Sequence, residues 1–346
     1  MLRYEHGGDI FSHQKIDLDY SANLNPLGMP EPVKEALRAR VDEFAHYPDP
    51  YCRKLCQNLA EYEDTDRDYI LCGNGAADLI VRLCLALKPQ KALICAPTFS
   101  EYEKAVIQSG GKVVYHRLEE NEGFQLTPRI LQELTPELDM VFLCNPNNPT
   151  GRLIDFELLK NIAKKCRENQ ILFVLDECFL DFTRGKSIKS LLPSNPYLVI
   201  LKAFTKIYAM AGLRLGYMLS ANRQVLRQIE GFGQSWSVSG PAQTAGSAAL
   251  TCRGWVAASR LMTEEERQYL VGELQALNIQ VFPSDANFLL FRSRPQLYER
   301  MLKRGILIRR CDNFPGLEAG YFRTGIKTRQ ENQRLTAALK EALADE

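Results

Sequence analysis

The sequence predicts an α/β fold in which a mostly parallel β-sheet carries helices on both faces. The first observation is that short runs of Val, Ile and Leu alternate with segments of helical periodicity between residues 69 and 201. The second is that several of these runs end in glycine, asparagine or aspartate. The third is a change after about residue 240, where shorter strands and longer helices predict a separate α+β unit.

The chain before the first strand predicts an irregular arm followed by two helices. Residues 1–30 are rich in turn-forming residues and show no sustained period. From Glu31 the apolar spacing is typical of an amphipathic helix, with Pro32 in its first turn. That helix should end before the proline-containing segment 46–50, and a second helix is expected over residues 52–62.

The central region predicts six strands of a parallel sheet, with helices between them. The strands are expected at residues 69–72, 92–95, 112–116, 140–144, 171–175 and 198–201, and the helices at 76–87, 100–109, 128–134 and 156–168. Ligands of such sheets bind beyond the carboxyl ends of the strands. The segments 73–77 and 145–151, together with Asp176 and Lys206, follow such ends and should therefore converge on one crevice.

The C-terminal third predicts the smaller α+β unit. Helices are expected at residues 242–251, 256–277 and 296–303 and from residue 331, and strands at 279–282, 287–291, 306–308 and 321–324. We therefore expect an N-terminal arm over residues 1–30 that packs with the small domain, a large domain over 31–240 and a small domain over 241–346.

The composition indicates an ordinary globular protein. Of 346 residues, 45% are hydrophobic and 25% charged, and the formal net charge is +1. This balance offers no electrostatic reason to expect nucleic acid or an anionic membrane as a partner. The first residues carry no apolar core, and no apolar run is long enough to span a bilayer.

The cysteines predict a reduced, cytoplasmic protein without a structural metal. Most of the ten stand singly inside apolar runs, as do Cys84, Cys95 and Cys144, and are expected to be small buried hydrophobes. Cys52 and Cys56 lie one helical turn apart but lack two further ligands, and the four histidines show no metal-ligand spacing.

Lys206 is the most informative residue, because it stands among apolar residues in the stretch 201–217. Burial disfavours the charged form of a lysine and makes its amine a nucleophile towards a carbonyl. A Schiff base with pyridoxal phosphate (PLP) needs such a lysine, and Arg214 could then bind the phosphate. The alternative is a solvated lysine on a loop between a strand and a helix.

Four other strand-end residues or segments have both a cofactor-binding and a structural interpretation. Segment 73–77 joins a strand to a helix N-terminus, which either binds phosphate or is a simple turn. Asn148 lies in a proline-rich turn and could donate to a phenolate oxygen and a substrate carboxylate. Asp176 could pair with a protonated pyridine nitrogen or be solvated. Tyr102 could stack on a flat ring or lie in the core.

Taken together, GNGAAD, APTFSEY, NPNNPTG, LDECFLDF and FTKIYAMAGLRLGY resemble the fold-type I PLP-dependent enzymes of the class I/II aminotransferase family over nearly the whole chain. The resemblance implies a seven-stranded sheet. The segments 6–8, 20–28, 306–317 and 321–323 are most similar to the branch that decarboxylates L-threonine O-3-phosphate in cobalamin biosynthesis.

This resemblance implies a role for each matching residue. Lys206 would form the Schiff base, Asp176 would pair with the pyridine nitrogen, and Tyr102 would stack on the ring. Residues implied to bind the cofactor are Ala76, Ala77, Tyr102, Asn148, Asp176, Thr205, Lys206, Arg214 and, from the other subunit of a homodimer, Tyr47. Residues implied to bind a small phosphorylated amino acid are His6, Gly7, Asn23, Asn148, Arg309 and Arg323.

Two positions depart from the family pattern. Ala203 stands where many members have Ser or Thr near the phosphate, and Phe179 stands where typical aminotransferases have Tyr. The absent tyrosine hydroxyl weakens the case for an aminotransferase.

The implied reaction is therefore a decarboxylation, with serine phosphate as a possible variant substrate. The first alternative is a histidinol-phosphate or related aminotransferase. A second alternative is a PLP-binding regulator. Regulators of this type usually carry a fused DNA-binding module, and we expect the 30-residue arm to be too short to form one.

Overall fold

The computed structural model describes residues 6–13 and 15–344. The other residues of the predicted arm (1–5 and 14) and of the predicted small domain (345–346) lie outside this part. A seven-stranded sheet forms the centre in the order β2-β8-β7-β6-β5-β3-β4. Its strands are β2 (Ile70–Gly73), β3 (Lys91–Ala96), β4 (Lys112–Arg117), β5 (Met140–Cys144), β6 (Leu172–Asp176), β7 (Leu198–Ala203) and β8 (Gly216–Leu219). The sheet is parallel except for β8, which confirms the predicted fold class.

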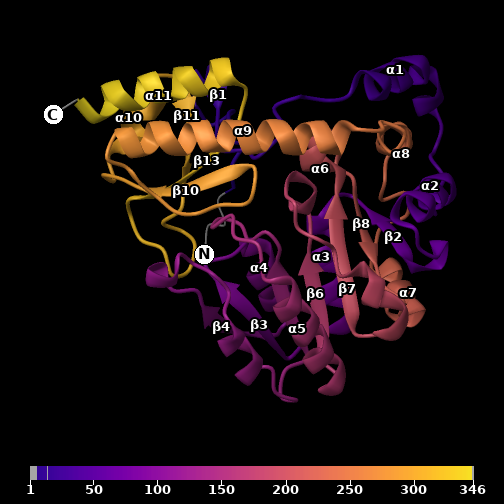
Figure 1. Ribbon diagram of the computed structural model, residues 1–346. Helices are drawn as coiled ribbons and strands as arrows, with labels where there is room; N and C mark the ends of the chain where they lie inside the picture. Colours follow the sequence, from indigo (N-terminus) through magenta and orange to yellow (C-terminus); the bar gives the residue numbers. More distant parts are fainter. Residues whose placement is uncertain (1–5, 14, 345–346) are drawn as a thin grey trace.

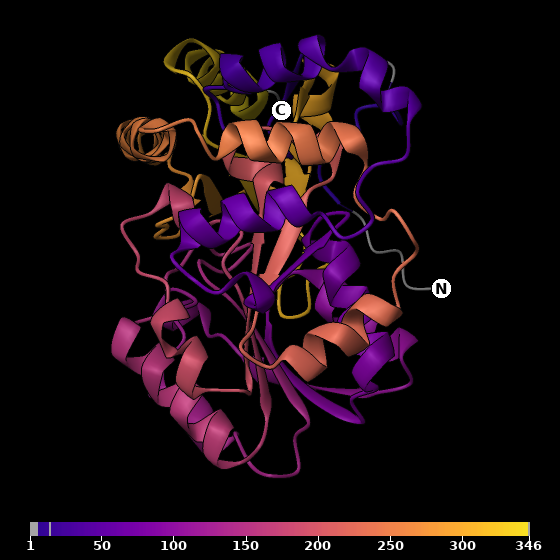
Figure 2. The same ribbon diagram turned by 90° about the vertical axis from the view of Figure 1, so that its right-hand side faces the viewer.

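Helices cover both faces of this sheet (Figure 2). Since neighbouring residues of each strand point to opposite sides, the inner strands contribute side chains to two cores. On β6, Leu172 and Val174 pack in the core under α3 (Ala76–Leu87) and α4 (Ser100–Gln108). Phe173 faces the other core, under α2 (Arg53–Glu63) and α5 (Phe156–Glu168). Strands buried on both sides explain the continuous apolar runs of the sequence.

Two elements of this region lack a clear signal in the residue pattern. The seventh strand, β8, has four residues and returns antiparallel after the Lys206 loop, so only the four-residue helix α6 (Phe204–Ile207) and the 3-10 helix Ala211–Leu213 separate it from β7. Helix α7 (Arg223–Gly231) follows it and packs on α3. The helix predicted at residues 128–134 is the 3-10 helix Pro128–Gln132.

The C-terminal part contains a second, antiparallel sheet in the order β12-β13-β10-β9. Its strands are β9 (Gln280–Val281), β10 (Phe288–Arg292), β12 (Arg309–Arg310) and β13 (Tyr321–Gly325), and its helices are α10 (Leu297–Lys303) and α11 (Arg329–Ala344). The arm joins this part, since β1 (Leu18–Asp19) pairs in parallel with β11 (Ile306–Leu307). The Tyr20 hydroxyl also donates to Asn332 on α11 at 3.0 Å.

Two helices connect the two parts. Helix α8 (Gly240–Ala249) packs against α1 (Glu31–Ala39) and α2. Helix α9 (Trp255–Ala276) extends from the region of α8 to the C-terminal sheet (Figure 1). The domain boundary at residue 240 stays a prediction, and α8 on its C-terminal side contacts helices of the predicted large domain. Among the described residues, no helix combines the length and apolar character that a membrane crossing requires.

A buried ion cluster ties α2 to the strands beneath the active-site loop. The Glu63 carboxylate is 1% exposed and accepts from Lys202 on β7 at 2.9 Å, Lys189 at 2.8 Å and the Tyr217 hydroxyl on β8 at 2.5 Å. Burial opposes ionisation of Glu63, but the two ammonium groups outweigh it and lower its pKa to about 2.

Candidate active site

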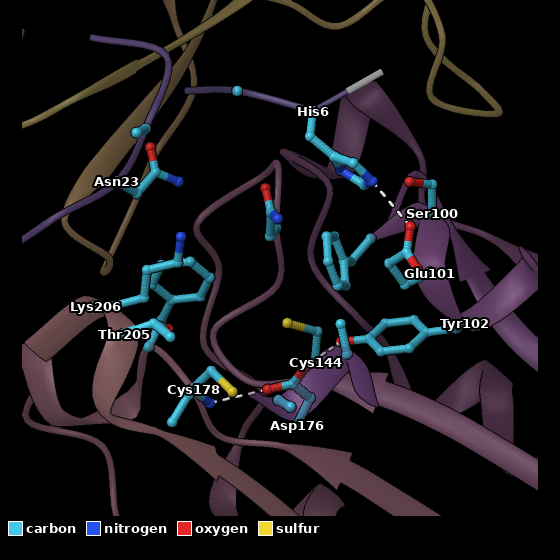
Figure 3. Close-up of a pocket in the computed structure, with 18 of the residues that line it drawn as sticks. His6, Asn23, Ser100, Glu101, Tyr102, Cys144, Asp176, Cys178, Thr205 and Lys206 are labelled. Atoms are coloured by element: carbon cyan, nitrogen blue, oxygen red, sulfur yellow. Dashed lines mark hydrogen bonds and ion pairs between the residues drawn. The ribbon is translucent and has the colours of Figure 1, made fainter. Parts of the chain in front are cut away.

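A cavity of about 490 Å³ lies where β5, β6 and β7 end. Cys144, Asp176 and Leu201 are aligned at this edge by strand pairing, so the loops that follow diverge around one space. Thirteen of the fourteen residues predicted for the site line it, namely His6, Gly7, Asn23, Ala76, Ala77, Tyr102, Asn148, Asp176, Thr205, Lys206, Arg214, Arg309 and Arg323. Figure 3 shows Lys206 and Tyr102 on opposite sides, Asp176 at the base and His6 at the top.

Asp176 provides a fixed, buried carboxylate at the base of the cavity. One oxygen accepts from the Tyr102 hydroxyl at 2.6 Å, and the other accepts from the backbone N–H of Cys178 at 2.9 Å. Burial raises the pKa of Tyr102 well above its usual value, so its hydroxyl remains a donor. A carboxylate held in this way can receive a further N–H from a protonated ring nitrogen.

Tyr102 has a different contact from the predicted one. Its ring is fully buried and stacks on Phe142, with a centroid distance of 5.2 Å, and its hydroxyl is directed at Asp176. The structure therefore makes Tyr102 a residue that orients Asp176. Phe99 also lines the cavity, three residues earlier in the same segment, and was not predicted. Its aromatic side chain directly after β3 was the available signal.

We expect Tyr102→Phe to weaken PLP binding and lower kcat by about 10- to 100-fold, because it removes a hydrogen bond to a buried charge. Both quantities can be measured by cofactor titration and steady-state kinetics. Tyr115→Phe is the matched control, since Tyr115 donates to Glu103 outside the cavity. Equal behaviour of the two variants would contradict the orienting role.

Lys206 has the lowered pKa that the sequence predicts for a nucleophilic amine. It lies on the short helix α6 (Phe204–Ile207), directly after β7. Burial and then the positive charges of Arg323 and Arg214 lower its pKa to about 8, against the partial opposition of Cys178. Its ammonium nitrogen lies 5.9 Å from the centroid of the Phe179 ring.

A phosphate-binding cradle lies at the N-terminus of α3. Gly75 precedes the helix with φ of +86°, and a Cβ atom there would lie 2.7 Å from the Arg214 guanidinium. Glycine is therefore required both by the backbone and by the approach of Arg214. The amides of Ala76 and Ala77 open the helix, so dipole and guanidinium attract an anion together. Ala203 lines the cavity without adding a hydroxyl.

The far end of the cavity carries polar atoms without partners. Arg323 on β13 is buried and donates to the Asn148 side chain and, at 2.6 Å, to the Ser21 carbonyl. Its Nε, like the Asn23 Oδ1, has no hydrogen-bond partner among the described residues. Burial, with Arg309 nearby and Cys311 opposing, lowers the pKa of Arg323 to about 10. The free guanidinium N–H is suited to a ligand carboxylate, and the free amide oxygen is suited to an N–H or O–H of the ligand.

Four residues with ionisable side chains lie at the mouth of the cavity. His6 Nε2 lies 2.9 Å from Glu101 Oε1, and the Lys104 ammonium lies 3.2 Å from the same oxygen. Arg309 also lines the cavity, and its guanidinium donates to Asn313 at 2.8 Å. Glu101 and Lys104 were not predicted, because their place depends on the arm folding back over α4.

Tyr47 is the one predicted residue that lies outside the cavity. Its side chain is 81% exposed and stacks on Trp236 with a centroid distance of 4.5 Å. It borders a separate hollow beside α1 and α8. Its predicted role requires a second subunit, so it stays a prediction.

The donor set fits PLP. Asp176 suits the ring nitrogen, Lys206 the aldehyde carbon, and the α3 cradle with Arg214 the phosphate. No group of three or more metal-ligating side chains is found in the described ranges.

Comparison with known proteins agrees with this geometry. The family model for aminotransferase class I and II matches residues 14–339. Threonine-phosphate decarboxylase of Salmonella typhimurium is 40% identical over 94% of this chain and 91% of its own length.

Two solved structures have the same fold. Histidinol-phosphate aminotransferase from Clostridium acetobutylicum has a TM-score of 0.88 and 32% identity, covering 94% of this chain and 98% of its own. L-threonine-O-3-phosphate decarboxylase from Porphyromonas gingivalis has a TM-score of 0.83 and 26% identity, covering 94% and 99%. This chain therefore belongs to the aminotransferase class I and II family of PLP-dependent enzymes.

Proposed function

We propose that the chain decarboxylates L-threonine O-3-phosphate to (R)-1-amino-2-propanol O-2-phosphate in cobalamin biosynthesis. The observation that carries this proposal is the 40% identity with the Salmonella threonine-phosphate decarboxylase over 94% of the chain. The cofactor-binding residues alone do not select a reaction, since Lys206 and Asp176 suit PLP chemistry of several kinds. Selection must come from the residues that hold the substrate.

The cofactor half of the cavity would hold PLP by four kinds of contact. Asp176, oriented by Tyr102, binds the ring nitrogen, and Asn148 binds the ring oxygen. Phe99 replaces Tyr102 as the residue we propose to stack on the ring. Ala76 and Ala77 amides, the Thr205 hydroxyl and Arg214 hold the phosphate. When bound, PLP supplies an electron sink for the pair of electrons left at Cα by a broken bond.

The substrate half would decide which bond breaks. Which Cα bond the cofactor would weaken depends on how the substrate is oriented, so the contacts at the two charged ends of the substrate would set the outcome. Arg323 offers an unpartnered donor and Asn23 an unpartnered acceptor, and His6, Gly7 and Arg309 lie towards the mouth. A carboxylate oriented for cleavage by these residues would leave as CO2, and the Lys206 ammonium would supply the proton that replaces it at Cα.

We also propose a cytoplasmic homodimer in which Tyr47 reaches the cofactor phosphate of the partner. The exposed position of Tyr47 beside Trp236 is compatible with this role. A reducing compartment is favoured by ten free cysteines, including Cys56 and Cys72 with sulfur atoms only 3.7 Å apart.

The second candidate is a histidinol-phosphate aminotransferase, favoured by the TM-score of 0.88 with the Clostridium enzyme. One assay separates the two functions. Holoprotein with O-phospho-L-threonine should release CO2 without forming a 2-oxo acid, and O-phospho-L-serine can be compared in parallel. Conversion of histidinol phosphate that depends on 2-oxoglutarate, with no CO2 from either phosphoamino acid, would overturn the proposal.

A further inference from the structure

The mouth of the cavity contains a carboxylate whose purpose the proposed reaction does not explain. Glu101 lies on α4 with its side chain only 8% exposed, although it borders a cavity built for an anionic substrate. It accepts from His6 at 2.9 Å and from Lys104 at 3.2 Å. The hydrogen bond from His6 holds the pKa of Glu101 below its usual value, against burial and with help from Lys104. Glu101 is therefore an ionised counter-ion between two cation-forming side chains.

The contact between His6 and Glu101 is one of two that hold the N-terminal arm over the cavity. The other is made by Ser21, which binds the arm at Gly8. The Gly8 amide donates to the Ser21 hydroxyl at 2.7 Å, and that hydroxyl donates to Asp19 at 2.6 Å. Gly7 lies so close to the Ser21 backbone that a Cβ atom could not be accommodated. The arm is thus fixed at residues 7–8 by the β1 segment, and His6 is oriented by Glu101 (Figure 3).

The position of this contact within the cavity indicates which part of the substrate it serves. With PLP bound as proposed, the α3 cradle and Arg214 would hold the cofactor phosphate, and Arg323 with Asn148 would lie on the ring side of the cavity. The remaining polar end of the cavity is the mouth, where His6 and Lys104 are held by Glu101. A doubly charged phosphate is the substrate group that most needs preoriented cationic donors.

We propose that Glu101 is a positioning residue that holds His6 at the mouth of the cavity for the substrate phosphate. The inference rests on the proposed function only for the identity of the ligand, a phosphorylated amino acid. Glu101 does not touch the substrate in this arrangement. It acts by binding Nε2 of the His6 imidazole, which fixes the orientation of the ring. The His6 side chain therefore loses little conformational freedom when the phosphate binds.

The test compares Glu101→Gln, His6→Gln and the double variant as holoproteins. Each single variant should raise KM for O-phospho-L-threonine by about 10- to 100-fold with kcat within about threefold, because a charge-assisted contact to the ligand or its holder is lost. If Glu101 acts through His6, the double variant should bind no more weakly than His6→Gln, instead of showing the product of the two effects. Glu103→Gln on the same helix is the control, since Glu103 bonds Tyr115.

Calorimetric titration of each holoprotein with O-phospho-L-threonine measures the same affinities without turnover. The cofactor absorbance reports that the variants are folded and loaded, and Glu101→Asp, which keeps the charge, should lose less affinity than Glu101→Gln. An unchanged affinity in Glu101→Gln, or multiplicative effects in the double variant, would overturn the inference. Wild-type protein that binds the ligand but releases no CO2 would instead contradict the proposed function. The affinities of the single and double variants would then still test the role of Glu101.

Discussion

Lys206→Arg is expected to lower the rate of decarboxylation by on the order of 10⁴-fold and to abolish the covalent bond to the cofactor. The pKa of Lys206 is about 8, compared with 10.5 for an ordinary lysine. Near neutral pH its neutral, nucleophilic form is therefore roughly 300-fold more abundant than in an exposed lysine. Arginine keeps a positive charge in the same place but cannot lose its proton, so it cannot form the bond.

The outcome can be read without measuring turnover. Borohydride reduction of the wild-type holoprotein should fix the cofactor on the peptide that contains Lys206, whereas the variant should release it on denaturation. Lys164→Arg is the control, because the Lys164 side chain is 67% exposed on α5. Covalent cofactor or wild-type activity in Lys206→Arg would require another nucleophile and refute the assignment.

The second large effect is on stability and concerns the buried ion cluster. Glu63→Gln is expected to lower the free energy of unfolding by about 3–5 kcal/mol at pH 7, because it leaves the ammonium of Lys202 buried without its charged partner. Urea unfolding of the holoprotein measures the change. Glu61→Gln is the matched control on the same helix, since Glu61 is exposed and accepts only from Gln57 in the described structure. It should change stability by less than about 0.5 kcal/mol.

The contribution of Glu63 should depend on pH with a defined sign. Its pKa is about 2 in the folded chain and near 4.5 when unfolded, so the folded state binds fewer protons between these values. The stabilisation is therefore complete above pH 4.5 and is lost as the pH falls towards 2. The difference between wild type and Glu63→Gln should shrink on acidification from pH 7 to pH 3. A difference that stays constant would contradict the ion-pair explanation.

The sequence was most informative where burial on both faces forces a simple pattern. The apolar runs of β3, β5, β6 and β7 predicted the parallel sheet, and the polar residues after them predicted the crevice. The residue patterns predicted six strands for the central sheet, whereas the structure has seven, the number that the family resemblance implied. β8 is too short, and too closely joined to the Lys206 loop, to show a pattern of its own.

Side-chain direction and contacts between distant segments could not be predicted. The APTFSEY segment indicated an aromatic ring at the site, but a helix start does not show which ring faces the ligand, and Tyr102 is directed at Asp176. Glu101 gains its partner 95 positions away only when the arm folds back. Glu63 carries no local signal either, because its three partners come from elements far along the chain.

The two hydrogen bonds that Arg323 donates to Ser21 and Asn148 have a consequence for how this cavity can change during evolution. Apart from Asn148 and α4, the substrate half comes from the first 23 residues and from the strands after residue 305, whereas the cofactor half is complete by residue 214. Exchange of the two chain ends between relatives could therefore alter the accepted substrate while the inherited cofactor chemistry is retained.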